Sequence, residues 1–463
     1  MTTEIPAQNP NENPIKFDSS LAHHMRPVIR AVRGFPVKAT APDGTEHQML
    51  GLADARQVSE RMVVTFPGFG VVIPLLDGTR DVDQIVQQVG RGLTRDMLEQ
   101  FVAQLDGAGL ILGPNYDAMV AEMRKAFDSQ AILPPGTTAG VCDALLNGSE
   151  ETKNIPEGPE REAAAARKLR EYFDSMIAEA LKDVADPALT SLPKAIVAPH
   201  LDYPRGGLNY AAIYGRLRVA DRPDRVVILG TNHFGESTGV CGCDKGFSTA
   251  LGACHLDEGM SNALKGKLGD ALFANRFDHE REHSIELQIP WIQHVFGKDA
   301  QGNYPKVFAA LVHDPVVANG ESYDGRGVAL QPFVDALKQA MSELPGRTLV
   351  ICSADMSHVG PAFGDQRPLL GEDGTEQGEA AAQFRNSVFQ TDDEMLGLVV
   401  QNKPAELVSS MAWQQNPTRW CSVGNIVAGL MVVEPKDIKL LRYGPVIDEQ
   451  GTGMVTSVAM VMN

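Results

Sequence analysis

Two stretches decide the fold of the larger part of the chain: KAIVAPH at residues 194–200 and RVVILGTNH at residues 225–233. Each begins with a short apolar run of the length typical of a buried β-strand. Each run ends in a turn that carries a histidine, His200 or His233. In open α/β sheets the carboxyl ends of the strands form the crevice where ligands bind. The sequence therefore predicts that the two imidazoles converge on one site at the sheet edge.

Further patterns extend this interpretation over residues 192–463. Apolar runs predict strands at 194–198, 225–229, 306–312, 348–352 and 455–462. Helical stretches alternate with several of these strands, which is typical of a mostly parallel sheet flanked by helices. We therefore predict an α/β fold for this domain.

The chain before residue 192 divides into three parts. Residues 1–27 are polar and rich in Asn and Pro, which predicts a disordered tail. Residues 28–113 combine strand-like pieces at 62–66, 70–73 and 110–112 with two amphipathic helices, the second capped by Thr94. That pattern predicts a small winged-helix-like domain. Residues 114–191 form a helical connector whose strongest helix spans 163–181.

Composition excludes several classes of protein. The net charge of −18 argues against a nucleic-acid partner, because phosphate binding needs a basic surface. No run approaches the roughly 20 apolar residues of a membrane helix, and the first residues do not form a signal peptide. The six cysteines are too sparse for a disulfide framework. We expect a soluble, cytoplasmic protein without a membrane partner.

Two further segments carry residues that could do chemistry. In DHEREHSIELQ, residues 278–288, His283 and Glu286 lie three apart and share a face if the segment is helical. They form either a functional pair or a capping and salt-bridge device. In CSADMSHVG, residues 352–360, Asp355 and His358 follow another buried strand. Without a G-x-S-x-G elbow a serine nucleophile is disfavoured, and metal ligation or a base held by Asp355 is preferred.

Together these segments resemble the Memo family, which includes the proteins called AmmeMemoRadiSam system protein B. The matching segments are Ala198 to His200, Gly230 to His233, Glu282 to Glu286, Ser353 to His358, and the helix start from Cys421 to Ile426. The family is similar to the class III extradiol dioxygenases, which use non-haem Fe(II) to open catechol rings. The resemblance implies that His200 and His233 are the metal-site histidines and that His283 lies beside them.

Two departures from the family pattern affect the ligand set. Some members have a cysteine where this chain has Ser357, so the resemblance implies that a thiolate ligand is absent here. The third ligand is then His358, Asp355 or His283. After His200 the chain carries Asp202, whose carboxylate could complete a two-histidine, one-carboxylate triad. The alternative is that Asp202 only pairs with Arg205.

The small domain has a resemblance of its own. IPLLDGTRDV at residues 73–82 and LDGAGLI at residues 105–111 resemble the PqqD-like family of winged-helix domains, which recruit precursor peptides. The second helix of this unit carries acidic residues, which disfavours insertion into a DNA groove. The resemblance implies a peptide partner. The alternative is that this unit merely packs on the larger domain.

Two functions follow as hypotheses. The first is a metal-dependent, dioxygenase-type oxidation of a small or peptide-borne aromatic, with Fe(II) favoured and copper or zinc as alternatives. His200 and His233 hold the ion with Asp202 or His358, His283 acts as general base, and Glu286 orients it. The second is a non-catalytic adaptor that binds a peptide and a partner enzyme such as a radical SAM protein.

Overall fold

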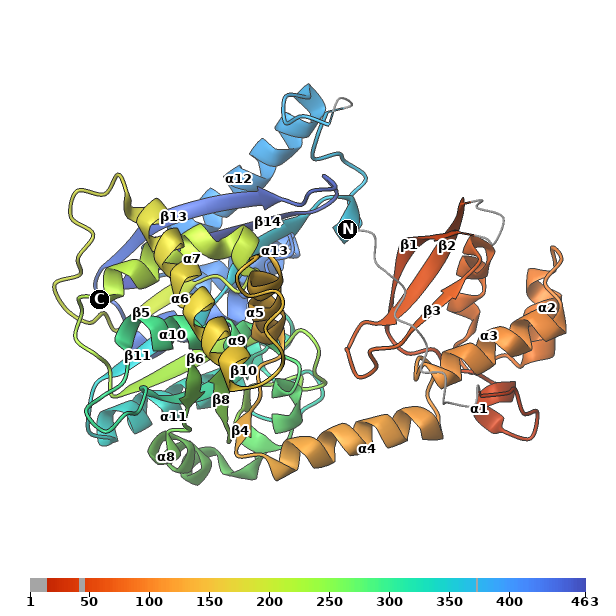
Figure 1. Cartoon of the computed structure of the whole chain (residues 1–463), viewed down its shortest axis with the longest axis horizontal. Helices are drawn as coiled ribbons and strands as arrows, with labels where there is room; N and C mark the ends of the chain where they lie inside the picture. The colour runs from red at the N-terminus through yellow and green to blue at the C-terminus, as the bar shows by residue number, and fades with distance from the viewer. Residues whose placement is uncertain (1–14, 41–45, 372–373) are drawn as a thin grey trace. The chain divides into compact units, whose positions relative to one another are not determined.

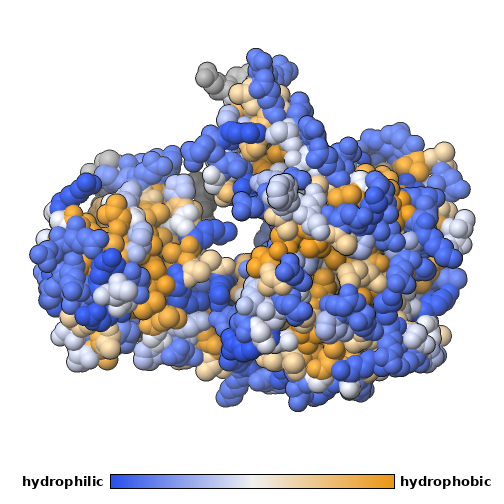
Figure 2. Space-filling model, turned by 180° about the vertical axis from the view of Figure 1, so that it is seen from behind, coloured by the Kyte–Doolittle hydropathy of each residue, from blue (hydrophilic) through white to orange (hydrophobic). Residues whose placement is uncertain are grey.

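The computed structural model describes residues 15–40, 46–371 and 374–463 (Figure 1). Contacts divide the chain into two compact units, one that ends at Ser129 and one that spans Gln130–Asn463. Each has a hydrophobic core of its own. Apolar side chains also reach the surface of both units among polar ones, as Figure 2 shows.

The first unit contains a three-stranded antiparallel sheet and the predicted pair of amphipathic helices. The sheet has the order β1-β2-β3, with strands Val32–Thr40, Glu46–Asp54 and Met62–Thr65. The helices are α2 (Val82–Val89), α3 (Arg95–Gly107) and α4 (Pro114–Ser129). Thr94 caps α3 as predicted, because its hydroxyl accepts from the Met97 N–H. The resemblance of this unit to PqqD-like domains stays a prediction.

Two details of the first unit differ from the sequence predictions. Residues 70–73 are not a strand but span two 3-10 helices, η1 (Pro67–Val71) and η2 (Ile73–Leu75), with Val72 between them. Their prolines lack the N–H that a sheet needs and favour the first turn of a helix. Residues 110–112 contribute a single bridge, between Ile29 and Ile111.

The predicted tail falls partly outside the described residues, which begin at residue 15. Its later part is ordered rather than disordered, because α1 (Ala22–Met25) forms and buries His24. The His24 ring accepts a hydrogen bond from the Asp18 N–H at Nδ1 and contacts Asp106 through Nε2. These polar contacts fix the start of the unit against α3.

The second unit confirms the α/β prediction. Its sheet has the order β12-β14-β5-β11-β6-β10-β7, and β13 pairs with β14. The strands are β5 (Ala195–Ala198), β6 (Arg225–Thr231), β7 (Cys241–Gly242), β10 (Lys306–Val312), β11 (Thr348–Ser353), β12 (Asp355–Val359), β13 (Ile438–Ile447) and β14 (Met454–Met462). The four central strands β5, β11, β6 and β10 are parallel, and the outer strands are antiparallel.

Helices cover both faces of this sheet, which explains why its central strands are apolar throughout. Helix α14 (Val423–Val433) packs on β11, β6 and β10, and α11 (Leu330–Glu343) packs on α14 and α8 (Glu258–Leu268). Helix α7 (Tyr203–Leu217) packs on β13, β14 and β5 beneath α6 (Pro159–Leu181), which Figure 1 draws in yellow in front of the sheet. The site described below lies at the carboxyl ends of the parallel strands.

The predicted connector belongs mostly to the second unit. After α4 the chain forms β4 (Ile132–Leu133), α5 (Thr137–Asn147) and α6, which contains the predicted helix 163–181. Strand β4 pairs with β8 (Gly246–Thr249), which pairs with β9 (Gly252–Cys254). The helices within the described residues are all too short or too polar to span a lipid bilayer.

Candidate metal centre

His200 follows the end of β5 and is buried. Its Nδ1 lies 3.1 Å from the carbonyl oxygen of Ser353, at the end of the neighbouring strand β11. A carbonyl can only accept, so Nδ1 carries the hydrogen and Nε2 keeps its lone pair. The His200 N–H donates to Asp355 Oδ1 at 3.3 Å. Two strand ends therefore set both the tautomer and the orientation of this ring.

His233 follows β6, and a buried carboxylate holds it in the same way. Its Nδ1 lies 3.0 Å from Glu282 Oε1, and its N–H donates to Glu282 Oε2 at 2.8 Å. Asp278 fixes the turn around His233 by accepting from the Asn232 side chain and the Ser237 N–H. The centroids of the His200 and His233 rings are 5.0 Å apart. The structure thus brings the two predicted histidines together, each with Nδ1 held by an acceptor.

The third group at this place is Cys421. Its Sγ lies 3.4 Å from His200 Nε2, and the ligand atoms of His200, His233 and Cys421 all lie within 4.8 Å of one another. Asn425, on the first turn of α14, ties this cysteine to the strand ends, because its side chain donates to Thr231 Oγ1 and to the Ser353 carbonyl. A set of two imidazoles and a thiol is a recognised combination for transition metals.

The expectation that no thiolate is available was wrong. It rested on position 357, where the structure buries Ser357 and directs its hydroxyl to Asp392. Cys421 opens the last of the matching segments but lies almost 190 residues from His233 along the chain. No local spacing marks it as a ligand, and only the fold brings it to the histidines.

His283 lies beside the pair, as the resemblance implied. Its ring stacks on that of His233 with centroids 4.7 Å apart, and its Nδ1 is 3.4 Å from Glu282 Oε1. Glu286, predicted to orient His283, does not do so. Its carboxylate accepts from the N–H groups of residues 136–138 and from the Thr138 hydroxyl, and so caps α5. The carboxylate beside the His283 ring is that of Glu282.

Two predicted ligands lie outside the metal-ligand groups found among the described residues. Asp202 is the N-cap of α7 and pairs with Arg205, whose Nε lies 2.7 Å from Asp202 Oδ2. This is the alternative considered for it, and its carboxylate does not belong to the group of ligand atoms that His200 and His233 form. His358, on β12, directs Nδ1 to the Met356 carbonyl at 2.9 Å. Burial lowers the pKa of His358 to about 4, so the ring is neutral near pH 7.

Two buried carboxylates flank the histidines, and their pKa values shift in opposite directions. Burial raises the pKa of Asp355 to about 7, and its Oδ2 lies 3.5 Å from His200 Nε2. Burial also disfavours the charge of Glu282, but the charge and the hydrogen bonds of His233 outweigh this and hold the pKa of Glu282 at about 2. Two carboxyl groups with separated pKa values are a pattern typical of sites that hold and move protons.

A second cluster of potential ligands lies in the first unit. It comprises His23, His24 and Asp106. Because His24 Nδ1 accepts from the Asp18 N–H, the hydrogen of this ring sits on Nε2, where it donates to Asp106. That nitrogen is a donor in a hydrogen bond and not an available metal ligand. The cluster is best explained as a structural contact.

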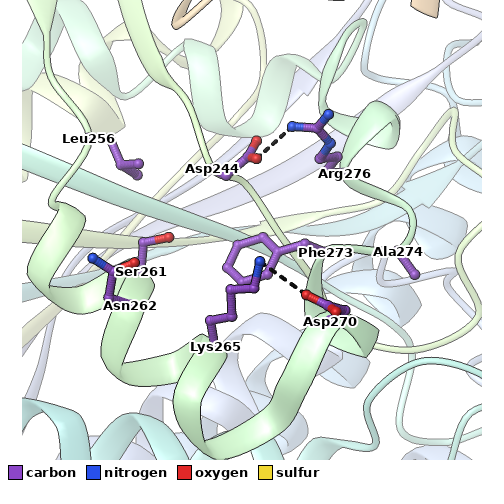
Figure 3. A pocket seen from close by; sticks show the side chains of 9 residues that line it. All are labelled: Asp244, Leu256, Ser261, Asn262, Lys265, Asp270, Phe273, Ala274 and Arg276. Atoms are coloured by element: carbon purple, nitrogen blue, oxygen red, sulfur yellow. Dashed lines mark hydrogen bonds and ion pairs between the residues drawn. The ribbon is translucent and has the colours of Figure 1, made fainter. Parts of the chain in front are cut away.

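A cavity of about 530 Å³ opens elsewhere on the second unit, over α8, η3 (Gly269–Phe273) and the start of η4 (Arg276–His279) (Figure 3). Its charged groups pair with one another: Arg276 with Asp244 at 2.5 Å, and Lys265 with Asp270 at 3.0 Å. None of the site residues lines it. The metal-site candidates therefore remain those at the strand ends.

Comparisons with known proteins identify the family of most of the second unit. The family model described as Memo-like protein matches residues 161–458, a range that contains His200, His233 and Cys421. A MEMO1 family protein of Methanopyrus kandleri is 35% identical over 170 residues, 36% of this chain and 53% of that protein. One of Thermotoga petrophila is 31% identical over 198 residues, 41% of this chain and 62% of that protein. The matches thus span a little over half the length of these relatives. The chain belongs to the Memo-like protein family.

Proposed function

We propose that this protein is a metal-dependent oxidoreductase that acts on a small or peptide-borne aromatic. In this proposal His200, His233 and Cys421 hold one divalent ion. The main observation that supports this metal site is the arrangement that the two imidazoles share. Each has Nδ1 fixed by an acceptor, the Ser353 carbonyl or Glu282, and the ligand atoms of both rings lie within 4.8 Å of each other and of one thiol. Imidazole ligands of metals are typically oriented by this kind of second hydrogen bond.

The spacing of the ligand atoms suits a single ion. Bonds of about 2.0–2.3 Å place two ligands of a tetrahedral ion about 3.5 Å apart, close to the 3.4 Å between Cys421 Sγ and His200 Nε2. Fe(II) is the ion we favour, and copper or zinc accept the same ligands. A redox-active ion held here would supply the electron transfer that lets molecular oxygen react with an electron-rich ring.

His283 is the candidate general base. Burial lowers its pKa, so the ring is neutral and can accept a proton near pH 7. Glu282 lies 3.4 Å from His283 Nδ1 and stabilises the imidazolium that forms when Nε2 takes a proton from a substrate hydroxyl. Side chains of His233 and His283 are each about a quarter exposed, 23% and 26%, so a substrate can reach them.

An aromatic substrate is supported by the side chain that follows His233. The ring of Phe234 lies 5.9 Å from that of His233 and 5.7 Å from that of His283. Aromatic rings at such distances form favourable edge-to-face or offset contacts. Asp355, whose pKa is about 7, can hold or release a proton beside His200. These groups bind, orient and exchange protons with a ring that carries hydroxyl groups.

Metal analysis of protein purified without oxygen tests this proposal. We expect about one ion per chain in the wild type, none in the double variant His200→Ala with His233→Ala, and oxygen consumption with catechol-type aromatics only in the loaded wild type. The variant His313→Ala is the control, because it removes a buried histidine whose Nε2 bonds to the Gly320 carbonyl. A folded double variant that keeps its metal would contradict the assignment of the ligands.

A second candidate function is a non-catalytic adaptor in a peptide-modification or radical SAM-associated system. The observation that favours it lies in the first unit. Among the described residues β1 pairs only with β2, which leaves one edge of the sheet for an extended peptide. Phe66 and Val71, which follow β3 in the sequence, have exposed side chains. Metal-free protein that binds peptide with nanomolar affinity and consumes no oxygen would favour the adaptor.

A further inference from the structure

Asp392 is a fully buried carboxylate that the proposed chemistry does not use. It lies on α12 (Glu379–Val400) and accepts four hydrogen bonds. Its Oδ1 accepts from Ser357 Oγ at 2.5 Å and from Trp420 Nε1 at 2.7 Å. Its Oδ2 accepts from Tyr443 Oη and Thr456 Oγ1, both at 2.6 Å. Four donors occupy all the acceptor positions of a carboxylate, so every lone pair of Asp392 has a partner.

The two donors on Oδ1 adjoin the metal centre. Trp420 immediately precedes Cys421, and Ser357 lies between Asp355 and His358 on β12. A backbone hydrogen bond of 2.8 Å from the His358 N–H to the Thr418 carbonyl joins the same two segments. Asp392 Oδ1 therefore connects the segment that carries the thiol with the strand that carries Asp355.

The segment before Cys421 needs such an anchor. Gln415, Asn416 and Arg419 have φ angles of 57°, 45° and 58°, in the left-handed region that residues other than glycine rarely adopt. Such conformations persist where surrounding contacts over-determine them. Trp420 supplies one of these contacts: its ring is buried, and its indole N–H, the single polar group of that side chain, donates to Asp392.

We propose that Asp392 is a positioning residue for the metal centre, which fixes Cys421 through Trp420 and β12 through Ser357. The inference rests on the proposed metal site. A leucine at this position fills similar space but accepts no hydrogen bond, so Ser357 and Trp420 both lose their acceptor. Partners that orient metal ligands typically contribute 10–100-fold to metal affinity. We therefore expect a neutral side chain at position 392 to loosen the thiol rather than only to lower stability.

Cobalt binding to the full chain tests the proposal, because a cobalt–thiolate bond has its own charge-transfer absorption. We expect Asp392→Leu and Trp420→Phe to weaken Co(II) binding by about 10–100-fold and to diminish that absorption. Tyr443→Phe is the matched control. It removes one donor from the same carboxylate, but on Oδ2, away from Cys421. We expect it to keep both the affinity and the absorption of the wild type.

Three results would overturn this role of Asp392. They are wild-type cobalt affinity in Asp392→Leu, wild-type affinity in Trp420→Phe, and equal losses in Trp420→Phe and Tyr443→Phe. Should Asp392→Leu not fold, the comparison of Trp420→Phe with Tyr443→Phe decides, since both keep the carboxylate. Cobalt bound with full affinity by Cys421→Ser and by His200→Ala would instead disprove the metal site itself, whatever position 392 does.

Discussion

At the scale of single residues, the site shows how partners decide the protonation of buried carboxylates. Glu282 and Asp355 are both buried, so both lose hydration of the charged form. Glu282 accepts from the N–H and the ring of His233 and from the Ser284 N–H, which compensates its charge. Within the described part of the chain Asp355 accepts one backbone hydrogen bond, from the His200 N–H, at 3.3 Å. The first is therefore a fixed anion and the second a group that titrates near neutral pH.

The substitution Asp355→Asn tests this difference. The ordinary pKa of 3.8 applies in the unfolded chain, and burial raises the folded value to about 7. The folded state then keeps a proton that the unfolded state releases, so stability falls as pH rises from about 4 to 7. We expect metal-free Asp355→Asn to lose this slope and to exceed the wild type at pH 8 by about 2–4 kcal/mol. Urea unfolding at pH 5 and pH 8 measures this pH dependence of stability. The same pH dependence in both proteins would refute the prediction.

The substitution Glu282→Gln tests the carboxylate whose pKa is lowered. Glutamine keeps the size of the side chain but removes the charge that orients His233 and faces His283. We expect metal affinity to fall by about 10–100-fold with little change of secondary structure. Glu280→Gln is the neighbouring control, since no hydrogen bond joins Glu280 to either histidine in the described chain. Competition with a coloured chelator measures the affinity, and equal affinities for the two variants would contradict the role of Glu282.

At the scale of elements, the sequence predicted strands best where both faces are buried. Strands β5, β6, β10 and β11 lie in the centre of the sheet, and their continuous apolar runs reveal them. Strand β13 was missed because most of its residues are partly or fully exposed and it pairs with the sheet at its edge, through β14. Strand β12 was missed because its polar residues serve the site.

The site itself was predictable only in part. His200 and His233 each follow a recognisable strand, so their convergence follows from parallel topology. Cys421 opens a helix far along the chain, and its approach to His200 depends on how α14 packs on β6 and β11. Glu286 was assigned to His283 because they are neighbours in sequence. Its actual partners, residues 136–138, lie about 150 residues away, beyond any local pattern.

The contact of Glu286 with α5 makes a prediction about that element. A carboxylate at a helix N-terminus satisfies free N–H groups and the helix dipole. We expect Glu286→Gln to destabilise the second unit by about 1–3 kcal/mol and to speed amide exchange at residues 136–138. Glu160→Gln, in the exposed first turn of α6, is the control. Unchanged exchange at residues 136–138 would show that the carboxylate does not hold this helix start.

At the scale of the whole molecule, the cores explain why the chain has two units. The first core gathers side chains from the small sheet and from α2 and α3, such as Leu52, Ile85 and Phe101. The second gathers side chains from the large sheet and its helices, such as Val227, Phe333 and Ile426. Each of these two cores consists of side chains from its own unit. Segments with separate cores usually fold as separate domains.

Division of the chain between Ser129 and Gln130 is the corresponding experiment. The fragment 130–463 keeps the sheet, α5 with Glu286, all three candidate ligands and Asp392, so we expect it to fold and to bind metal with the affinity of the full chain. The fragment 15–129 keeps the first core and should unfold cooperatively by itself. Calorimetry of the full chain should then show two transitions that match those of the fragments. A fragment 130–463 that aggregates or binds no metal, beside a full chain that does bind it, would mean that the first unit is required for the site.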